Sequence, residues 1–401
     1  MSNRTTGSLP TWMNRRLSFA EQNFSPAAST FFDLVRFVAA VLVVMEHLAS
    51  RLLVGYGYLE MPGVGVQVLY LLNLLGGPAV IVFFVLSGLF ISRTVYRAYA
   101  GSRGFVWRDY LIARASRLYI VLVPALALTW LLDIPASASG YINKSSGLDV
   151  LLGNLFFLQT IVVPQYGSNA PLWSLSNEFW YYMAFPLLLG AGFGGKVAAR
   201  FTCAVGFVLV LALIGMNKSL YFLHWMLGAV VLILPMRRAR PSLLAMTVAT
   251  LALVGAFLLR PIVARGRLVF DGMDIPLFWP DLFVALSAAF AIYVAWGFFS
   301  HRKQLIGPRI DGAIRVGASF SFSLYLIHYP IINWAYFLAR SLGFAELQPS
   351  LVSVVLEIVI VAIMCAFAWG FAKCTENHTG KLRGFLRGDR RNGLTAHKAV
   401  D

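Results

Sequence analysis

Long apolar segments recur along the whole chain and constrain its fold more than any other feature. A helix needs about 20 predominantly apolar residues to cross the hydrocarbon core of a bilayer. Windows of about this length lie at roughly 31–52, 70–92, 110–132, 171–193, 201–216, 219–235, 242–259, 277–299, 317–339 and 351–372. Only 12% of the residues are charged, whereas a soluble domain has about 25%. The sequence therefore predicts an all-α polytopic membrane protein with about ten transmembrane helices.

The basic residues predict the orientation of these helices. The formal net charge is +16, but Lys and Arg recur between the apolar windows rather than in one patch, so no nucleic-acid partner is expected. With the N-terminus inside, most of the 33 basic residues fall in cytoplasmic segments, as the positive-inside rule requires. We therefore expect both termini in the cytoplasm. The predicted division is a cytoplasmic tail at 1–30, a transmembrane domain at 31–372 and a basic cytoplasmic tail at 373–401.

Several other features are predicted to be absent. The three cysteines show no ligand spacing, so neither a disulfide framework nor a metal site is expected. The first 29 residues are polar and basic without a short apolar core, which argues against a cleavable signal. The apolar stretch 148–164 is too short to span and is predicted to be re-entrant or interfacial.

The first apolar window, FFDLVRFVAAVLVVMEHLAS, carries the ionisable residues Asp33, Arg36, Glu46 and His47. Such groups cost roughly 2.5–3.5 kcal/mol each at the bilayer centre for Asp, Lys and Arg, so they normally face the protein interior. Arg36 and His47 point the same way on a helix, about 16 Å apart along its axis. Asp33 lies one turn before Arg36 and can pair with it. The window therefore predicts a polar stripe that marks a pathway or a reaction site.

His47 and Arg36 each have a second interpretation. His47 can take and give a proton near neutral pH, which makes it a candidate general base. The alternative for His47 is a hydrogen bond between helices. The alternative for Arg36 is an anchor whose charged end reaches the membrane surface.

Five segments in order resemble the membrane-bound acyltransferase 3 family. Arg36, followed after ten residues by His47, is similar to the Arg-x10-His first helix of that family. The other four segments are GGPAVIVFFVLSGLFI (76–91), RASR (114–117), PLWSLSNEFWYY (171–182) and SFSLYLIHYPII (321–332). The resemblance covers residues 31 to about 372. It departs at Leu34, where the family often has Gly, and at Ile81, where the family often has Asp.

The resemblance implies transfer of an acyl group, commonly acetyl, from acyl-coenzyme A to a carbohydrate hydroxyl. Acetyl-CoA would be a co-substrate, and no permanently bound cofactor is expected. Arg114 and Arg117 lie one turn apart and suit bidentate contacts with the donor phosphates, with Arg36 beside them. The alternative is that both arginines only contribute to the positive-inside charge.

The resemblance also assigns roles around His47. His47 would remove the proton of the acceptor hydroxyl, and an acyl-histidine intermediate is the alternative. Glu178 would orient His47 or bind the acceptor, although a carboxylate is favoured at a helix N-terminus in any case. Ser174 shares a helix face with Glu178.

Aromatic residues complete the predicted substrate site. Trp173 and Tyr182 would stack on a sugar, and an interfacial aromatic belt explains them equally well. Tyr325 and His328 lie at i and i+3 near Pro330, which is expected to kink the helix. A structural role is the alternative for His328.

The expected location is a bacterial inner membrane, because the donor is made inside and surface polysaccharides are finished outside. The expected partners are the acyl-CoA donor, a carbohydrate acceptor and membrane lipid, and the sequence gives no indication of the oligomeric state. The second candidate function is a transporter or flippase of a lipid-linked sugar. A third, a structural subunit, predicts that replacing His47 has no effect.

Overall fold

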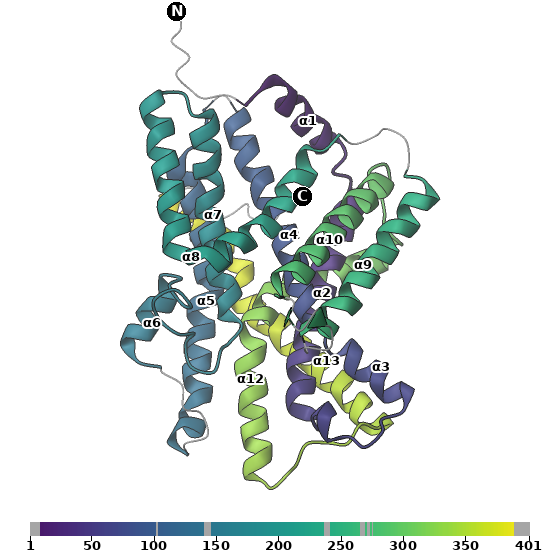
Figure 1. The fold of residues 1–401 in the computed structure, drawn as a ribbon. Coiled ribbons are helices and arrows are strands. Elements are labelled where there is room, and N and C mark those ends of the chain that lie inside the picture. Colours follow the sequence, from purple (N-terminus) through teal and green to yellow (C-terminus); the bar gives the residue numbers. More distant parts are fainter. Residues whose placement is uncertain are drawn as a thin grey trace, which may run out of the picture.

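The computed structural model describes residues 9–101, 103–139, 146–235, 241–264, 269–270, 273–274 and 276–388, and these form a bundle of helices (Figure 1). The elements of the first half are α1 (Thr11–Gln22), α2 (Pro26–Leu52), η1 (Tyr56–Tyr58), α3 (Val64–Leu72), α4 (Gly76–Ala100), α5 (Trp107–Ala138), α6 (Leu148–Leu155), α7 (Leu172–Phe193) and α8 (Val197–Ile233). Those of the second half are α9 (Leu243–Ala264), β1 (Val269–Phe270), β2 (Met273–Asp274), α10 (Phe278–Phe299), α11 (Pro308–Ser319), α12 (Ser321–Ser341), α13 (Leu351–Cys374), η2 (Glu376–His378) and α14 (Thr379–Arg387). The two short strands pair antiparallel.

The long apolar helices confirm the predicted fold class. Within the described ranges, seven helices are long and apolar enough to cross a membrane, or up to eight if the pair α11 and α12, bent by 54°, forms one span. The chain is therefore an all-α integral membrane protein. The count of about ten spans and the cytoplasmic position of both termini remain predictions.

The other predicted windows also fall on helices. The window 171–193 coincides with α7, which is not among the seven because polar side chains interrupt its first half. The window 201–216 and nearly all of the window 219–235 lie in the 37-residue α8, which ends at Ile233. A kink at Gly215, whose φ of 80° glycine tolerates, divides α8 into two helices. The predicted short segment at 148–164 forms only the eight-residue α6 and a loop.

Two glycines bring the backbones of α4 and α8 into direct contact. A Cβ added at Gly88 would lie 1.9 Å from the carbonyl O of Trp225, and one added at Gly228 would lie 1.9 Å from the carbonyl O of Val85. Small residues allow this close approach between membrane helices. The crossing places Ser87 of α4 beside Trp225, whose Nε1 donates to the Ser87 hydroxyl at 3.2 Å.

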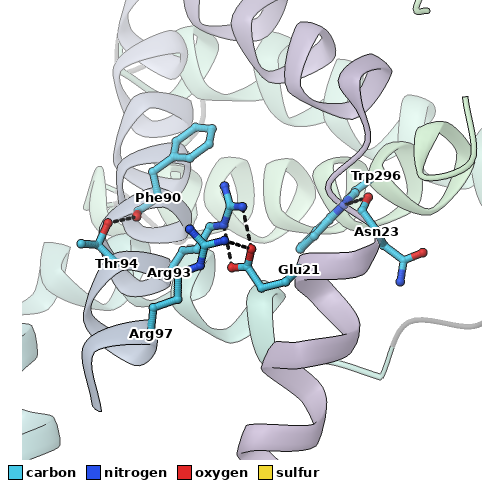
Figure 2. Close-up of polar contacts among 7 residues, drawn as sticks. All are labelled: Glu21, Asn23, Phe90, Arg93, Thr94, Arg97 and Trp296. Atoms are coloured by element: carbon cyan, nitrogen blue, oxygen red, sulfur yellow. Dashed lines mark hydrogen bonds and ion pairs between the residues drawn. The ribbon is translucent and has the colours of Figure 1, made fainter. Parts of the chain in front are cut away.

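Helices also form in the described parts of the two predicted tails. Leu17 and Ala20 bury one face of α1 against the bundle. Figure 2 shows the Glu21 carboxylate between Arg93 and Arg97 of α4. Arg93 binds it through Nε and Nη2, both at 2.7 Å, and Arg97 binds it through Nη2. Burial raises the pKa of the Glu21 carboxyl, but the two guanidiniums outweigh this and hold the pKa below its ordinary value. The predicted tail segments 1–8 and 389–401 lie outside the described residues.

Candidate active site

A cavity of about 350 Å³ opens between helices α2, α4, α5, α7 and α12. This volume lies in the range of small-molecule sites, about 300–1,000 Å³. Its wall includes five arginines and one carboxylate, namely Arg36, Arg93, Arg97, Arg114, Arg117 and Glu178. The cavity therefore favours an anionic ligand.

Most of the site residues predicted from the sequence line this cavity. They are Arg36, Arg114, Arg117, Ser174, Glu178, Tyr182 and Tyr325. Asp33, His47, Trp173 and His328 do not line it. The structure thus collects residues from five separate helices around one space, although they are up to 289 positions apart between Arg36 and Tyr325.

The predicted pair of Asp33 and Arg36 is present on α2. Arg36 Nη1 lies 3.6 Å from Asp33 Oδ1, and the guanidinium also lies over the Phe90 ring at 5.2 Å from its centroid. The ring and the carboxylate together restrict the guanidinium, since cations are attracted to both. Asp33 therefore positions Arg36 in the cavity wall.

Glu178 forms a hydrogen-bonded cluster with side chains of α4 and α7. Its Oε1 accepts from the Ser87 hydroxyl at 2.7 Å and from the Tyr182 hydroxyl, one helical turn away. Trp225 in turn donates to Ser87. Glu178 and His47 share no hydrogen bond in the described part of the chain, and the partner of His47 is another residue. Glu178 therefore lines the cavity as an acceptor held by two hydroxyl groups.

Ser87, Arg93 and Arg97 were not among the predicted site residues. Ser87 is the serine of the segment 76–91 that carried the family resemblance, so a signal for it was present in the sequence. Arg93 and Arg97 follow that segment, where the sequence alone indicates only two more positive-inside charges. Their contribution to the cavity becomes visible only from the packing of α4.

A second polar contact joins α7 to α12. The hydroxyls of Ser174 and Tyr325 lie 2.6 Å apart, and both are within hydrogen-bond reach of the Pro171 carbonyl O. Tyr325 lies one turn before His328 on α12. This contact is therefore the point at which the cavity approaches the histidines.

His47 and His328 form a hydrogen-bonded pair. His47 Nδ1 lies 2.8 Å from His328 Nε2, and the two rings are stacked at 15°. His328 Nδ1 lies 2.8 Å from the carbonyl O of Tyr325. A carbonyl oxygen can only accept, so His328 Nδ1 carries the proton and its Nε2 accepts in the neutral ring. His47 Nδ1 must then donate, which leaves the lone pair of a neutral His47 on Nε2.

The two histidines differ in exposure. His328 is completely buried, whereas His47 is partly exposed and packs edge-on against Tyr329 at 4.8 Å between ring centroids. Trp173 lies outside the cavity wall, edge-on to Phe84. The arrangement offers an arginine-lined cavity with a potential proton acceptor, His47 Nε2, beyond its Tyr325 side.

A family described as acyltransferase domain matches residues 29–372. An O-acetyl transferase of Shigella phage Sf6 is 29% identical over 163 residues, 39% of this chain and 44% of that protein. Acyltransferase MdmB of Streptomyces mycarofaciens is 22% identical over 378 residues, 88% of this chain and 92% of that protein. The chain thus spans less than half of the phage protein and most of the Streptomyces one. No solved structure matches.

Proposed function

The chain belongs to the acyltransferase 3 family and is an acyltransferase, and on that premise we propose that it moves an acyl group, acetyl by default, from acyl-coenzyme A to a carbohydrate hydroxyl. One observation carries the proposal. An arginine-lined cavity reaches Tyr325, one helical turn from a histidine pair whose geometry places the lone pair of a neutral His47 on Nε2.

The cavity is assigned to the donor. Coenzyme A carries several phosphate charges at one end and the thioester at the other. Arginine is the residue best suited to phosphate, because its planar fork donates two parallel hydrogen bonds. Arg36, Arg114 and Arg117 would bind the donor, and their side of the cavity would face the cytoplasm, where acyl-CoA is made.

His47 is assigned the proton transfer. Its Nε2 takes the proton of the acceptor hydroxyl while the hydroxyl oxygen attacks the thioester carbonyl carbon. The carbon–sulfur bond then breaks, and the sulfur leaves with the bonding electrons and takes the proton from His47. During this step His47 is an imidazolium, which is stabilised because its Nδ1–H donates to His328 Nε2.

Attack by His47 Nε2 on the thioester is the alternative route. It would form an acyl-histidine and release coenzyme A before the acceptor binds. Both routes need the same free nitrogen, so the His47–His328 hydrogen bond supports either one.

The acceptor is assigned to a carbohydrate from the family resemblance alone, and the printed name of the phage relative, O-acetyl transferase, supports a hydroxyl as the group that accepts the acetyl. His47 is partly exposed and lies outside the cavity wall, which would let an acceptor reach it from another side than the donor. In a bacterial inner membrane this arrangement would join a cytoplasmic donor to a sugar at the outer face. Acceptors that are modified only on the cytoplasmic face would contradict this placement.

The decisive experiment measures the transfer of radiolabelled acetyl from acetyl-CoA into membrane glycans. At equal expression, His47→Ala should lower the initial rate roughly 10²–10⁴-fold, the usual contribution of a general base. His301→Ala is the matched control, because His301 is exposed and outside the cavity wall, and it should retain the full rate. Equal incorporation by the wild type and His47→Ala would remove His47 from the reaction.

A further inference from the structure

The C-terminal helix α14 packs on the beginning of α5, next to the cavity. Arg108 Nη2 donates to the Arg387 carbonyl O at 3.4 Å, and Arg387 Nε lies 3.9 Å from Asp109 Oδ1. Just before α14, Glu376 Oε2 accepts from the backbone N and the hydroxyl of Ser323 on α12. The segment 376–387 is therefore fixed to two of the helices that form the cavity. It lies beyond residue 372, where the family match ends.

This packing gathers arginines of two helices. Arg383 of α14 lies within electrostatic range of Arg114, Arg117 and Arg387. Arg114 and Arg117 line the cavity, whereas Arg383 adjoins it through them. Of the nearby carboxylates, Asp109 pairs with Arg387. Glu376 and Glu178 lie within electrostatic range of Arg117 and Arg114, so they offset only part of the positive charge. Like charges held together in this way repel unless an anion lies between them.

Two of these guanidiniums have a buried donor without an acceptor. The Nε atoms of Arg114 and Arg383 are shielded from solvent and form no hydrogen bond within the part of the chain that the structure describes. Buried polar groups in native proteins are nearly always hydrogen-bonded, so an unpaired donor calls for a missing partner. A phosphate oxygen would satisfy both the unpaired nitrogens and the excess positive charge.

We propose that Arg383 joins Arg114 and Arg117 in a site for the phosphate groups at the nucleotide end of the acyl-CoA donor. The proposal rests on the proposed function. A cavity of 350 Å³ suits the acyl-bearing arm better than a whole coenzyme, so the nucleotide must extend past the cavity wall. Arg383 lies beyond the part of the wall that Arg114 and Arg117 form, so the nucleotide would lie there. The thioester would reach toward Tyr325 at the other end.

The test measures ligand binding to the full-length protein in nanodiscs of phosphatidylcholine by calorimetry. The ligands are coenzyme A, 3′,5′-ADP and pantetheine, which lacks phosphate. Arg383→Gln should weaken the binding of coenzyme A and 3′,5′-ADP about tenfold, because a charge-assisted contact is lost, and leave pantetheine unchanged. Lys381→Gln is the matched control, since it removes the same charge from an exposed position of α14 and should bind like the wild type.

Arg383→Lys keeps the charge without the planar fork, so its affinity should lie between those of the wild type and Arg383→Gln. If Arg383→Gln does not fold, Arg383→Lys provides the test by itself. Coenzyme A binding by Arg383→Lys at the wild-type level would then overturn the proposal. If Arg383→Gln binds coenzyme A as tightly as Lys381→Gln, the proposal is wrong although the donor assignment stands. A wild type that binds neither coenzyme A nor 3′,5′-ADP would contradict the donor assignment itself.

Phosphates of lipid headgroups are the competing source of the same chemistry. To distinguish lipid phosphates from the phosphates of coenzyme A, the binding measurements are repeated in nanodiscs that contain phosphatidylglycerol. A rise in melting temperature with phosphatidylglycerol that Arg383→Gln abolishes, with unchanged affinity for coenzyme A, would assign Arg383 to lipid and overturn the proposal.

Discussion

At the scale of single residues, the histidine pair shows how one hydrogen bond fixes the state of another group. The Tyr325 carbonyl O selects the tautomer of His328, and His328 selects the tautomer of His47. Both histidines and the pairing of Asp33 with Arg36 are predicted from the sequence. That His47 and His328 meet is not predictable in this way, because they lie 281 positions apart on different helices. Local periodicity reports only which residues share a helix face.

Replacement of His328 tests this selection of the tautomer. In His328→Leu the partner of His47 Nδ1 is lost, and we expect kcat to fall roughly 10²–10⁴-fold, because the imidazolium is no longer stabilised or oriented. In His328→Gln the side-chain oxygen can replace Nε2 as the acceptor, so we expect part of the activity to return. The KM for the donor should stay unchanged in both. Similar kcat values for the Leu and Gln variants would contradict a role through hydrogen bonding.

The cluster around Glu178 makes a second prediction at this scale. Tyr182→Phe removes one of the two hydroxyl groups that donate to Glu178 Oε1. A hydrogen bond to a charged group contributes about 1.5–3 kcal/mol, so the thermal transition should move to a lower temperature. Tyr58→Phe is the control, because Tyr58 is 86% exposed, and it should melt as the wild type does. Equal melting temperatures of Tyr182→Phe and Tyr58→Phe would show that the hydrogen bond from Ser87 is sufficient to hold Glu178.

At the scale of elements, the apolar windows predicted the long helices well because each window must match the thickness of the bilayer. The same reasoning missed α1 and α14, which are short and polar and bury only part of their surface. It also could not predict the 54° bend between α11 and α12, which depends on how the two helices pack rather than on their composition. What composition cannot reveal is where two helices touch.

The crossing of α4 and α8 provides a test of such packing. In Gly88→Ala the new methyl group would lie 1.9 Å from the Trp225 carbonyl O, so one backbone must move. Overpacking of this kind typically costs about 1–3 kcal/mol, and we expect a lower free energy of unfolding, measured in mild detergent. Gly255→Ala on α9 is the control, because a Cβ there meets nothing within 4 Å. Unchanged stability of Gly88→Ala would contradict the close crossing.

The attachment of α1 through Glu21 predicts a dependence on pH. The pKa of the Glu21 carboxyl is lower in the folded protein than its ordinary value of 4.5. Its stabilising effect is therefore complete above pH 4.5 and is lost as the pH falls through the folded-state pKa. We expect limited proteolysis to cleave within α1 faster below this pH. Glu21→Gln should show the fast cleavage already at neutral pH. Equal cleavage of Glu21→Gln and the wild type at neutral pH would contradict the attachment of α1 through Glu21.

At the scale of the whole molecule, charge sets the predicted orientation. Most of the basic residues belong to segments that the predicted topology places in the cytoplasm, including those around the cavity arginines. This orientation stays a prediction. Bulk charge does not distinguish the arginines that line the cavity from the other basic residues, since that difference depends on the packing of the helices.

Thiol labelling tests the orientation directly. Cys374 is a free, exposed cysteine at the end of α13. In a variant that carries Cys203→Ser and Cys365→Ser, a membrane-impermeant maleimide should label Cys374 in inverted vesicles and not in intact cells. The same variant with Cys374→Ser is the control for background. Labelling in intact cells would place the C-terminal end of α13 outside and overturn the predicted topology.

The glycine contact between α4 and α8 has a consequence for how such a protein can diversify. Ser87 and Trp225 lie beside the point where the two backbones approach each other, and Trp225 donates to Ser87. Ser87 also lines the cavity, whose wall is otherwise made largely of side chains from five helices. Substitutions elsewhere in that wall can therefore alter which ligand fits while the contact between the two main chains keeps Ser87 in place.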